Sequence, residues 1–282
     1  MPTYREALKI NERYALDNKK EPSAIKLLML HHTNKTSADL IQTMDDTMDD
    51  TVYKAFRQSV DDYIIRHKPV QYITGKEYFY GHHFIVSDKV LIPRFETEEL
   101  VGHVLDLKQE YFKDDPVKLL DVGTGSGCLA ITLSLEDNNI NAYGTDISKE
   151  ALDVAKENSK NLDSNVTFYE GSVLEPVKGK KFDILVSNPP YIPSEEYVEP
   201  LVKEHEPHLA LFGGIDGLDF YRVLLKDAES VLNDRYIIAL EHAYDKTKAI
   251  HKLIKKYLKH VRIIHKKDMQ GKDRMTFILK KA

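Results

Sequence analysis

The sequence is poor in several residue types that mark particular classes of protein. It has no tryptophan and only one cysteine, Cys128, among 282 residues. An intrachain disulfide and a cysteine-based metal site are therefore excluded. No stretch approaches 18 uninterrupted apolar residues, and the first twenty residues lack the apolar segment of a signal peptide. These absences predict a protein with no membrane span and no secretion signal, in a reducing compartment such as the cytoplasm.

A strong excess of charge of one sign is also missing. The 40 Lys and Arg residues stand against 45 Asp and Glu residues, for a formal net charge of -5. This balance gives no overall attraction to nucleic acid or to an anionic membrane. One basic run at residues 251–268 could attract RNA, although such runs usually form the solvated face of a helix and a strand. The histidine pairs at 31–32 and 82–83 have no third ligand at metal-site spacing, so no metal site is predicted.

The chain divides into three stretches of different pattern. Apolar residues recur at three- to four-residue spacing through residues 1–68, which predicts a small N-terminal helical bundle. Ser37 is the expected N-cap of one helix, and Pro69 is expected to end the last helix near His67. Residues 69–95 are rich in aromatic and β-branched residues with glycines between them, which predicts a β-hairpin linker.

Residues 96–282 predict an α/β domain. Short apolar runs alternate there with segments of helical periodicity, which indicates a Rossmann-like, doubly wound parallel sheet. The expected parallel strands are residues 117–123, 141–147, 166–172, 182–188 and 235–242. Residues 262–268 and 274–281 are expected to close the sheet as an antiparallel pair.

A glycine-rich turn, "LLDVGTGSG" at 119–127, follows the first of these strands and opens a helix. Its glycines permit a tight turn and let a ligand approach the backbone closely. Ligands of open α/β sheets bind beyond the carboxyl ends of the strands, near this first turn. A tight turn without a ligand would show the same pattern, and the spacing is not the G-x-G-x-x-G of dinucleotide sites. The candidate cofactor-binding residues here are Gly123, Thr124, Gly125, Ser126 and Gly127.

Asp146 strengthens the prediction of a cofactor. It closes the second strand about twenty residues after the glycines, where a carboxylate can accept both hydroxyls of a ribose. The alternative is an N-cap for the helix that starts near Ser148. At the end of the third strand, Val173 beside Ser172 is expected to flank an adenine through its backbone. Nicotinamide cofactors and S-adenosylmethionine both carry an adenosine ribose, so these features do not choose between them.

The tetrad Asn188-Pro189-Pro190-Tyr191 ends the fourth strand and favours methyl transfer. An amide nitrogen is a poor nucleophile because its lone pair is delocalised into the carbonyl. The Asn188 side-chain oxygen and the Pro189 carbonyl can accept its N–H groups and aim the lone pair at an activated methyl group. The prolines fix φ and lack an N–H, and Tyr191 offers a flat stacking face. The alternative is that Pro-Pro merely ends a strand.

With these motifs, the chain resembles the protein-(glutamine-N5) methyltransferases that modify peptide chain release factors, the HemK/PrmC family. The resemblance covers nearly the whole chain, and is most specific at residues 69–81, 90–101, 119–134 and 186–193. It implies a class I S-adenosylmethionine-dependent methyltransferase domain, a small N-terminal helical domain and a β-hairpin linker. It also implies that the methyl acceptor is the glutamine of the Gly-Gly-Gln motif in class I release factors.

The resemblance carries over to individual residues. It implies that Asn188, Pro189, Pro190 and Tyr191 bind the acceptor amide, and that Asn188 also contacts the cofactor. Arg94, Glu96 and Thr97, in the stretch "LIPRFETEEL", are expected to shape the cofactor side of the pocket and its mouth. A linker salt bridge between Arg94 and Glu98 is the alternative. Phe95 stands where the family usually has a second proline, and Ala243 stands where it usually has glycine.

Three other functions remain open from the sequence. A nucleic-acid N-methyltransferase acting on adenine or guanine would use the same tetrad on a flipped base. It should also show a basic cleft, whereas the N-terminal stretch carries "MDDTMDD" at 44–50, so direct nucleic-acid contact is not expected. A methyltransferase-like binding module without activity is disfavoured by the intact glycine turn, Asp146 and tetrad. A nicotinamide oxidoreductase is disfavoured by the glycine spacing.

Overall fold

The computed structural model describes residues 1–281, which divide into two compact units. The first unit comprises residues 1–76 and 198–205, and the second comprises residues 77–197 and the chain from Glu206 onward. No helix within residues 1–281 is both long and apolar enough to cross a membrane.

The first unit is helical. Its core is formed by one apolar face of each longer helix, which includes Ile25, Leu28, Phe56 and Val60, all fully buried. The three- to four-residue spacing of these side chains places them on one side of each helix, as the sequence pattern predicts. The helices are α1 (Tyr4–Asp17), α2 (Ser23–Thr33), α3 (Ser37–Gln42), α4 (Asp50–Ile64), α5 (Val70–Thr74) and α9 (Pro200–Lys203).

The N-cap of α3 is Thr36, so the expectation of Ser37 is wrong by one residue. The Thr36 hydroxyl accepts the backbone N–H of Asp39, and the Asp39 carboxylate accepts the backbone N–H of Thr36. This reciprocal capping box satisfies two N–H groups that would otherwise lack partners at the helix end. Ser37 is the first helical residue.

Helix α4 ends at Ile64, which is earlier than the predicted end near His67. His67 has a φ of 55°, and this left-handed backbone conformation cannot continue a right-handed helix. The chain becomes helical again at α5, directly after Pro69, where the sequence predicts only a hairpin linker. The hairpin itself follows as β1 (Lys76–Phe79) and β2 (His82–Ile85).

The second unit is built on a seven-stranded sheet in the order β5-β4-β3-β6-β7-β9-β8. The first five strands are parallel, and β9 pairs antiparallel with β7 and β8. This arrangement confirms the predicted Rossmann-like α/β fold. The strands are β3 (Val117–Val122), β4 (Ile140–Asp146), β5 (Thr167–Glu170), β6 (Phe182–Ser187), β7 (Leu232–Glu241), β8 (Arg262–Lys267) and β9 (Asp273–Lys280).

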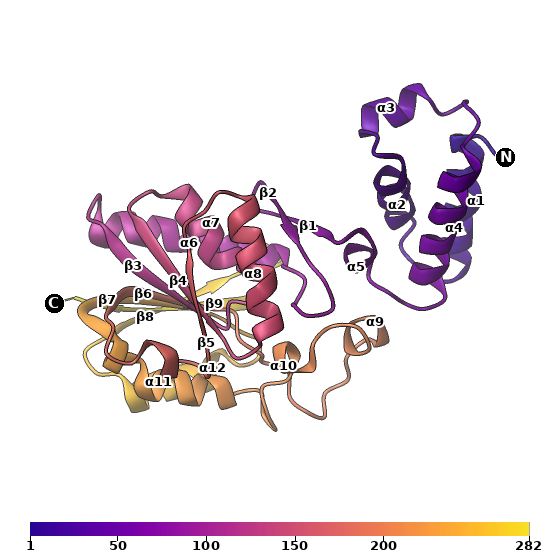
Figure 1. Cartoon of the computed structure of the whole chain (residues 1–282). Coiled ribbons are helices and arrows are strands. Elements are labelled where there is room, and N and C mark those ends of the chain that lie inside the picture. Colours follow the sequence, from indigo (N-terminus) through magenta and orange to yellow (C-terminus); the bar gives the residue numbers. More distant parts are fainter. Residues whose placement is uncertain (282) are drawn as a thin grey trace. The chain divides into compact units, whose positions relative to one another are not determined.

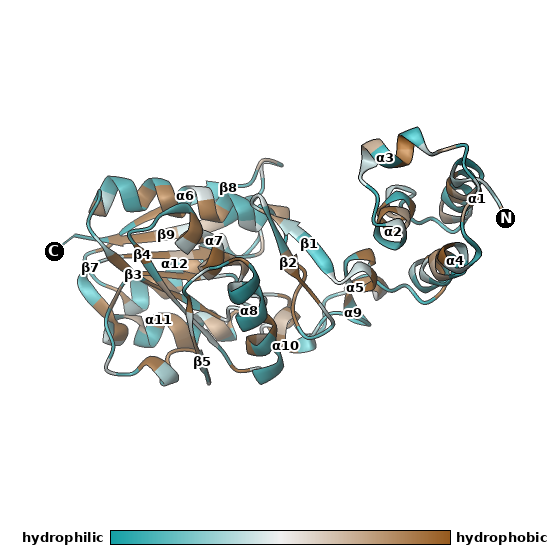
Figure 2. Cartoon of the chain, turned by 45° about the horizontal axis from the view of Figure 1, so that its top comes forward, coloured by the Kyte–Doolittle hydropathy of each residue, from teal (hydrophilic) through white to brown (hydrophobic). Residues whose placement is uncertain are grey.

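Helices cover both faces of this sheet (Figure 1). Ile184, Leu185 and Val186 of the central strand β6 are fully buried in succession, because neither face of the strand meets solvent. Figure 2 shows the resulting band of apolar strands between helices with polar outer faces. The main helices are α6 (Phe95–Phe112), α7 (Cys128–Glu136), α8 (Lys149–Asn161), α11 (Asp219–Val231) and α12 (Thr247–Tyr257); the short ones are η1 (Glu175–Val177) and α10 (His208–Leu211).

Candidate active site

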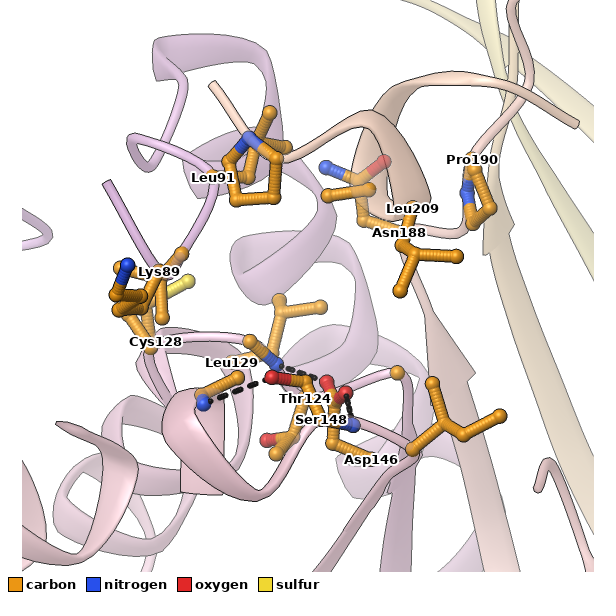
Figure 3. A pocket seen from close by; sticks show the side chains of 18 of the residues that line it. Lys89, Leu91, Thr124, Cys128, Leu129, Asp146, Ser148, Asn188, Pro190 and Leu209 are labelled. Atoms are coloured by element: carbon orange, nitrogen blue, oxygen red, sulfur yellow. Dashed lines mark hydrogen bonds between the residues drawn. The ribbon is translucent and has the colours of Figure 1, made fainter. Parts of the chain in front are cut away.

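A pocket of about 250 Å³ opens at the carboxyl ends of the parallel strands in the second unit. Loops that follow β3, β4, β5 and β6 all contribute to its wall, as expected for ligand sites of open α/β sheets. Figure 3 shows Asn188 and Pro190 across the pocket from Lys89 and Cys128, with Thr124, Ser148 and Asp146 below them. The lining includes Leu91, Thr97, Gly123, Thr124, Gly125, Ser126, Asp146, Ser172, Val173, Asn188, Pro190, Leu209 and Phe220.

The glycines of the first turn serve different purposes. Gly125 and Gly127 have φ angles of 55° and 82°, a left-handed conformation that costs glycine nothing. A Cβ on Gly125 would meet no heavy atom within 4 Å, so this backbone faces the open pocket. A Cβ on Gly127 would lie 2.8 Å from Ile131 Cδ1 and 3.2 Å from Ala155 Cβ. Gly125 therefore leaves space for a ligand, whereas Gly127 lets α7 and α8 pack closely.

This difference predicts opposite effects for two matched substitutions. Gly127→Ala should lower the free energy of unfolding by about 1–3 kcal/mol, because the new methyl group overpacks the contact between α7 and α8 at a strained φ. Gly125→Ala should cost less stability and should weaken cofactor binding instead. Urea denaturation and calorimetric titration of both variants measure the two effects. Equal losses of stability would contradict the assignment.

Asp146 uses both carboxylate oxygens to hold the turn. Its Oδ2 accepts the backbone N–H of Gly125 at 2.9 Å, and its Oδ1 accepts that of Ser148 at 2.9 Å (Figure 3). The N-cap of α8 is Ser148, whose hydroxyl accepts the backbone N–H of Ala151, so Asp146 does not itself cap the helix. Burial raises the pKa of Asp146. A carboxylate has about four acceptor sites, so Asp146 can still accept a ribose hydroxyl.

A second carboxylate, Asp121, is buried and hydrogen-bonded to the glycine-rich turn. Its Oδ2 accepts the hydroxyl of Thr124 at 2.6 Å, and its Oδ1 has no hydrogen-bond partner within the described part of the chain. Burial raises its pKa to about 7. The folded protein favours the protonated form of Asp121. The contribution of this group to folding stability is therefore complete below the unfolded pKa near 3.8 and is lost as the pH rises to about 7.

Asp121→Asn should therefore become more stable relative to the wild type as the pH rises. We expect the difference in unfolding free energy to grow by about 1.4 kcal/mol per pH unit between roughly pH 4 and 7, and then to level off. Urea denaturation of both proteins at pH 5, 6, 7 and 8 measures this difference. A difference that stays constant with pH would show that Asp121 is ionised in the folded protein throughout.

The tetrad lies where the sequence predicts, directly after β6. Asn188 and Pro190 line the pocket, while Pro189 and Tyr191 are not among its lining residues in the part of the chain that the structure describes. The loop is held by backbone hydrogen bonds from Ile192 to Leu211 and from Gly213 to Ile192. Burial raises the pKa of Tyr191 to about 12, so its phenol stays neutral.

The three residues singled out at the start of α6 have different surroundings. Thr97 lines the pocket and is 2% exposed. Arg94 forms an ion pair with the buried Glu206 at 2.5 Å, and the alternative pairing with Glu98 is wrong because the Glu98 carboxylate accepts the backbone N–H of Tyr80. Arg94 and Glu96 are absent from the pocket lining within residues 1–281.

Sequence reasoning missed several lining residues. Leu91 and Phe220 line the pocket, yet nothing in an isolated apolar residue marks it as part of a pocket wall. Cys128 also lines the pocket, but burial raises the pKa of its thiol to about 12, so it is not a nucleophile at neutral pH. Glu241 does not line the pocket but accepts the hydroxyl of the lining residue Thr97 at 2.7 Å, and a single glutamate at a strand end gives no signal of such a contact in the sequence.

The pocket fits S-adenosylmethionine, the cofactor that the sequence predicts. Gly125 leaves open space beside the backbone, Asp146 places a carboxylate in the lining, and the wall is mainly apolar, which suits an adenosine. Val173 and Asn188 both line this pocket. The predicted cofactor residues are thus brought to one cavity, except that Gly127 packs between helices.

Known proteins are similar in sequence to this chain over most of its length. Residues 13–75 match the PrmC N-terminal domain, and residues 87–215 match the methyltransferase small domain. A release factor glutamine methyltransferase of Bacillus cereus is 40% identical over 276 residues, which cover 96% of this chain and 97% of the relative. One from Bacillus subtilis is 42% identical over 282 residues, which cover 97% and 96%.

Solved structures show the same fold at lower identity. A methyltransferase from Pyrococcus furiosus superposes with a TM-score of 0.53 at 21% identity, covering 72% of this chain and 90% of that one. That likeness concerns the fold alone. The two Bacillus relatives match along almost the whole length of both chains. The chain therefore belongs to the family of release factor glutamine methyltransferases.

Proposed function

We propose that this chain transfers the methyl group of S-adenosylmethionine to the side-chain nitrogen of the glutamine in the Gly-Gly-Gln motif of class I release factors. One observation carries the proposal beyond family membership. Asn188 and Pro190 line the same pocket as Asp146 and Gly125, so one cavity brings together the residues proposed to bind the amide and those proposed to bind the cofactor. The two substrates of a direct transfer must meet in such a cavity.

The residues around the glycine turn would hold the cofactor. Asp146 would accept the ribose hydroxyls, Gly125 would let the backbone approach, and Val173 would flank the adenine. When bound, S-adenosylmethionine supplies a methyl group activated by a sulfonium. The chain itself needs no metal for this reaction, because the sulfonium is already a good leaving group.

The tetrad would hold the acceptor. The Asn188 side-chain oxygen and the Pro189 carbonyl accept the two N–H groups of the glutamine amide, which directs the nitrogen lone pair toward the methyl group. The positive charge that develops on the nitrogen strengthens both hydrogen bonds in the transition state. The excess proton then leaves to water. Tyr191, neutral and partly buried, would support the loop and offer a flat face for stacking on the amide.

The proposed partner is a protein rather than a nucleic acid. The same tetrad could hold an adenine or a guanine, but the formal charge of -5 gives no general attraction to phosphates. A release-factor substrate also places the reaction in the cytoplasm, where release factors act. The basic run at 251–268 is not assigned to nucleic acid.

Methyl transfer from labelled S-adenosylmethionine tests the proposal. The acceptors are a purified class I release factor, its Gly-Gly-Gln glutamine-to-alanine variant, and a pool of DNA and RNA. We expect label on the unmodified release factor alone. Label on the alanine variant would contradict the assigned glutamine, and label on nucleic acid would replace the substrate class while keeping the chemistry.

A further inference from the structure

A chain of hydrogen bonds leads from the tetrad into the interior of the second unit. The Asn188 side-chain Nδ2 donates to the Thr97 hydroxyl at 3.0 Å, and the Thr97 hydroxyl donates to Glu241 Oε2 at 2.7 Å. Thr97 is 2% exposed and Glu241 is 1% exposed. We call these two hydrogen bonds the relay. Its members come from the loop after β6, the first turn of α6 and the last residue of β7.

Which group donates in each hydrogen bond of the relay follows from the hydrogens that Thr97 and Glu241 carry. The Thr97 hydroxyl has one hydrogen, and an ionised carboxylate can only accept. Thr97 therefore gives its hydrogen to Glu241 and can only accept from Asn188. Asn188 must then turn its NH₂ group toward Thr97, which leaves its oxygen as the free end of the amide. That oxygen is the atom that an N–H of the acceptor needs.

We propose that Glu241, acting through Thr97, is a positioning residue that fixes which way the Asn188 amide faces. The inference rests on the proposed function, in which the Asn188 oxygen accepts an N–H of the substrate glutamine. Without this constraint the two ends of the amide are nearly equal in shape and can exchange by rotation about χ2. If the Asn188 NH₂ group faced the pocket, it would meet the N–H group of the substrate glutamine. Both groups are donors, so no hydrogen bond would hold the glutamine amide.

The protonation state of Glu241 decides the direction. Protonated Glu241 can donate to Thr97, whose hydroxyl is then free to donate to the Asn188 oxygen, which reverses the amide. Burial raises the pKa of Glu241 to about 7, so both states are within reach near neutral pH. Below that pH the reversed amide dominates, and above it the productive amide dominates.

Several charged or titratable groups surround Glu241. The Thr97 hydrogen bond and the charges of Arg274 and Arg94 lower its pKa, while Glu96 raises it. Tyr191 interacts with it from the tetrad loop, and Tyr221 donates its hydroxyl to the Glu241 backbone carbonyl at 2.6 Å. Within residues 1–281 no ion pair to Glu241 forms, since Arg274 pairs with Asp268 at 3.2 Å. Burial therefore remains the main influence.

Three variants test the relay by kinetics with a release factor at saturating cofactor, between pH 5.5 and 8.5. The wild-type kcat should fall on the acid side with a midpoint near the pKa of Glu241. Glu241→Gln should lose this acid limb, because its amide does not titrate. Thr97→Val, which keeps the shape, should lower kcat by about tenfold or more at pH 8. Thr97→Ser, which keeps the hydroxyl, should restore most of the rate.

The matched control is Glu110→Gln, which changes an exposed glutamate farther along α6 and should keep the acid limb. Asp121 also has a pKa of about 7, but it supports the cofactor turn, so its titration should appear in cofactor affinity rather than in kcat at saturation. An acid limb that persists in Glu241→Gln would overturn the proposal. A Thr97→Val enzyme with wild-type kcat would overturn it as well.

A second measurement needs no substrate and no cofactor. The ¹H–¹⁵N signals of the Asn188 side chain can be identified in the free enzyme as those missing from Asn188→Ala. They should shift with pH in the wild type, with a midpoint near 7, and should stay constant in Glu241→Gln. Signals that do not titrate in the wild type would overturn the relay. An enzyme that fails to methylate release factors would refute the proposed function. The Asn188 signals would still show whether Glu241 controls the orientation of the Asn188 amide.

Discussion

Asn188→Ala should lower kcat for release-factor methylation by about 10²- to 10³-fold, comparable with the loss of one preorganised hydrogen-bonding group at other enzymes' reacting atoms. The variant removes the oxygen that accepts an N–H of the acceptor, so the nitrogen lone pair is no longer directed at the methyl group. Cofactor affinity should change far less, because Asp146 and the glycine turn remain. Stopped time courses at saturating cofactor, together with calorimetric titration, separate the two quantities.

The control for this substitution is Asn161→Ala, which removes an exposed asparagine at the end of α8 and should keep the wild-type rate. Asn188→Asp is informative as well, since a carboxylate keeps an acceptor but changes the charge and removes the donor to Thr97. A wild-type kcat in Asn188→Ala would mean that the tetrad merely ends β6, which is the alternative that the sequence left open.

Asp146→Ala should weaken cofactor binding by about 10²-fold, which corresponds to two hydrogen bonds from ribose hydroxyls to a charged group at about 1.4 kcal/mol each. Part of the loss would come from the turn itself, because the N–H groups of Gly125 and Ser148 lose their acceptor. At saturating cofactor the variant should retain much of its kcat. Asp146→Ala should therefore change cofactor affinity more than kcat, whereas Asn188→Ala should change kcat more than cofactor affinity.

Asp153→Ala provides the matched control, since Asp153 is an exposed aspartate on α8 whose contact with Lys156 is long, at 4.0 Å. Asp146→Asn keeps one acceptor oxygen and should lie between the wild type and Asp146→Ala in cofactor affinity. Calorimetric titration with S-adenosylmethionine measures all three. An unchanged dissociation constant in Asp146→Ala would assign the carboxylate to holding the turn alone.

Much of the second unit follows from local patterns. Each of the seven strands of the main sheet lies where an apolar run predicts it, and the glycine turn and the tetrad both follow buried strands. These features depend on near neighbours in sequence: the two-residue period of strands, the conformational freedom of Gly125, and the fixed φ of the prolines. Helix ends were less well determined, because adjacent Thr36 and Ser37 are both good N-caps and only one can be used.

The composition and motifs alone thus determined the fold class, the place of the glycine turn and the place of the tetrad. Only the tertiary structure decided how side chains far apart in sequence are paired. Thr97 meets Glu241 across 144 residues and Asn188 across 91, because β6 and β7 are neighbours and Asn188 and Glu241 lie at the same end of the sheet.

The ion-pair partner of Arg94 likewise could not be predicted from the sequence. A spacing of four residues favours an ion pair with Glu98 within a helix. Arg94, however, is the N-cap of α6 and has an extended backbone, so its side chain does not follow the helical geometry and reaches Glu206 instead. Burial, which raises the pKa of Glu241, likewise depends on the covering of both sheet faces and cannot be read from the residues around it in sequence.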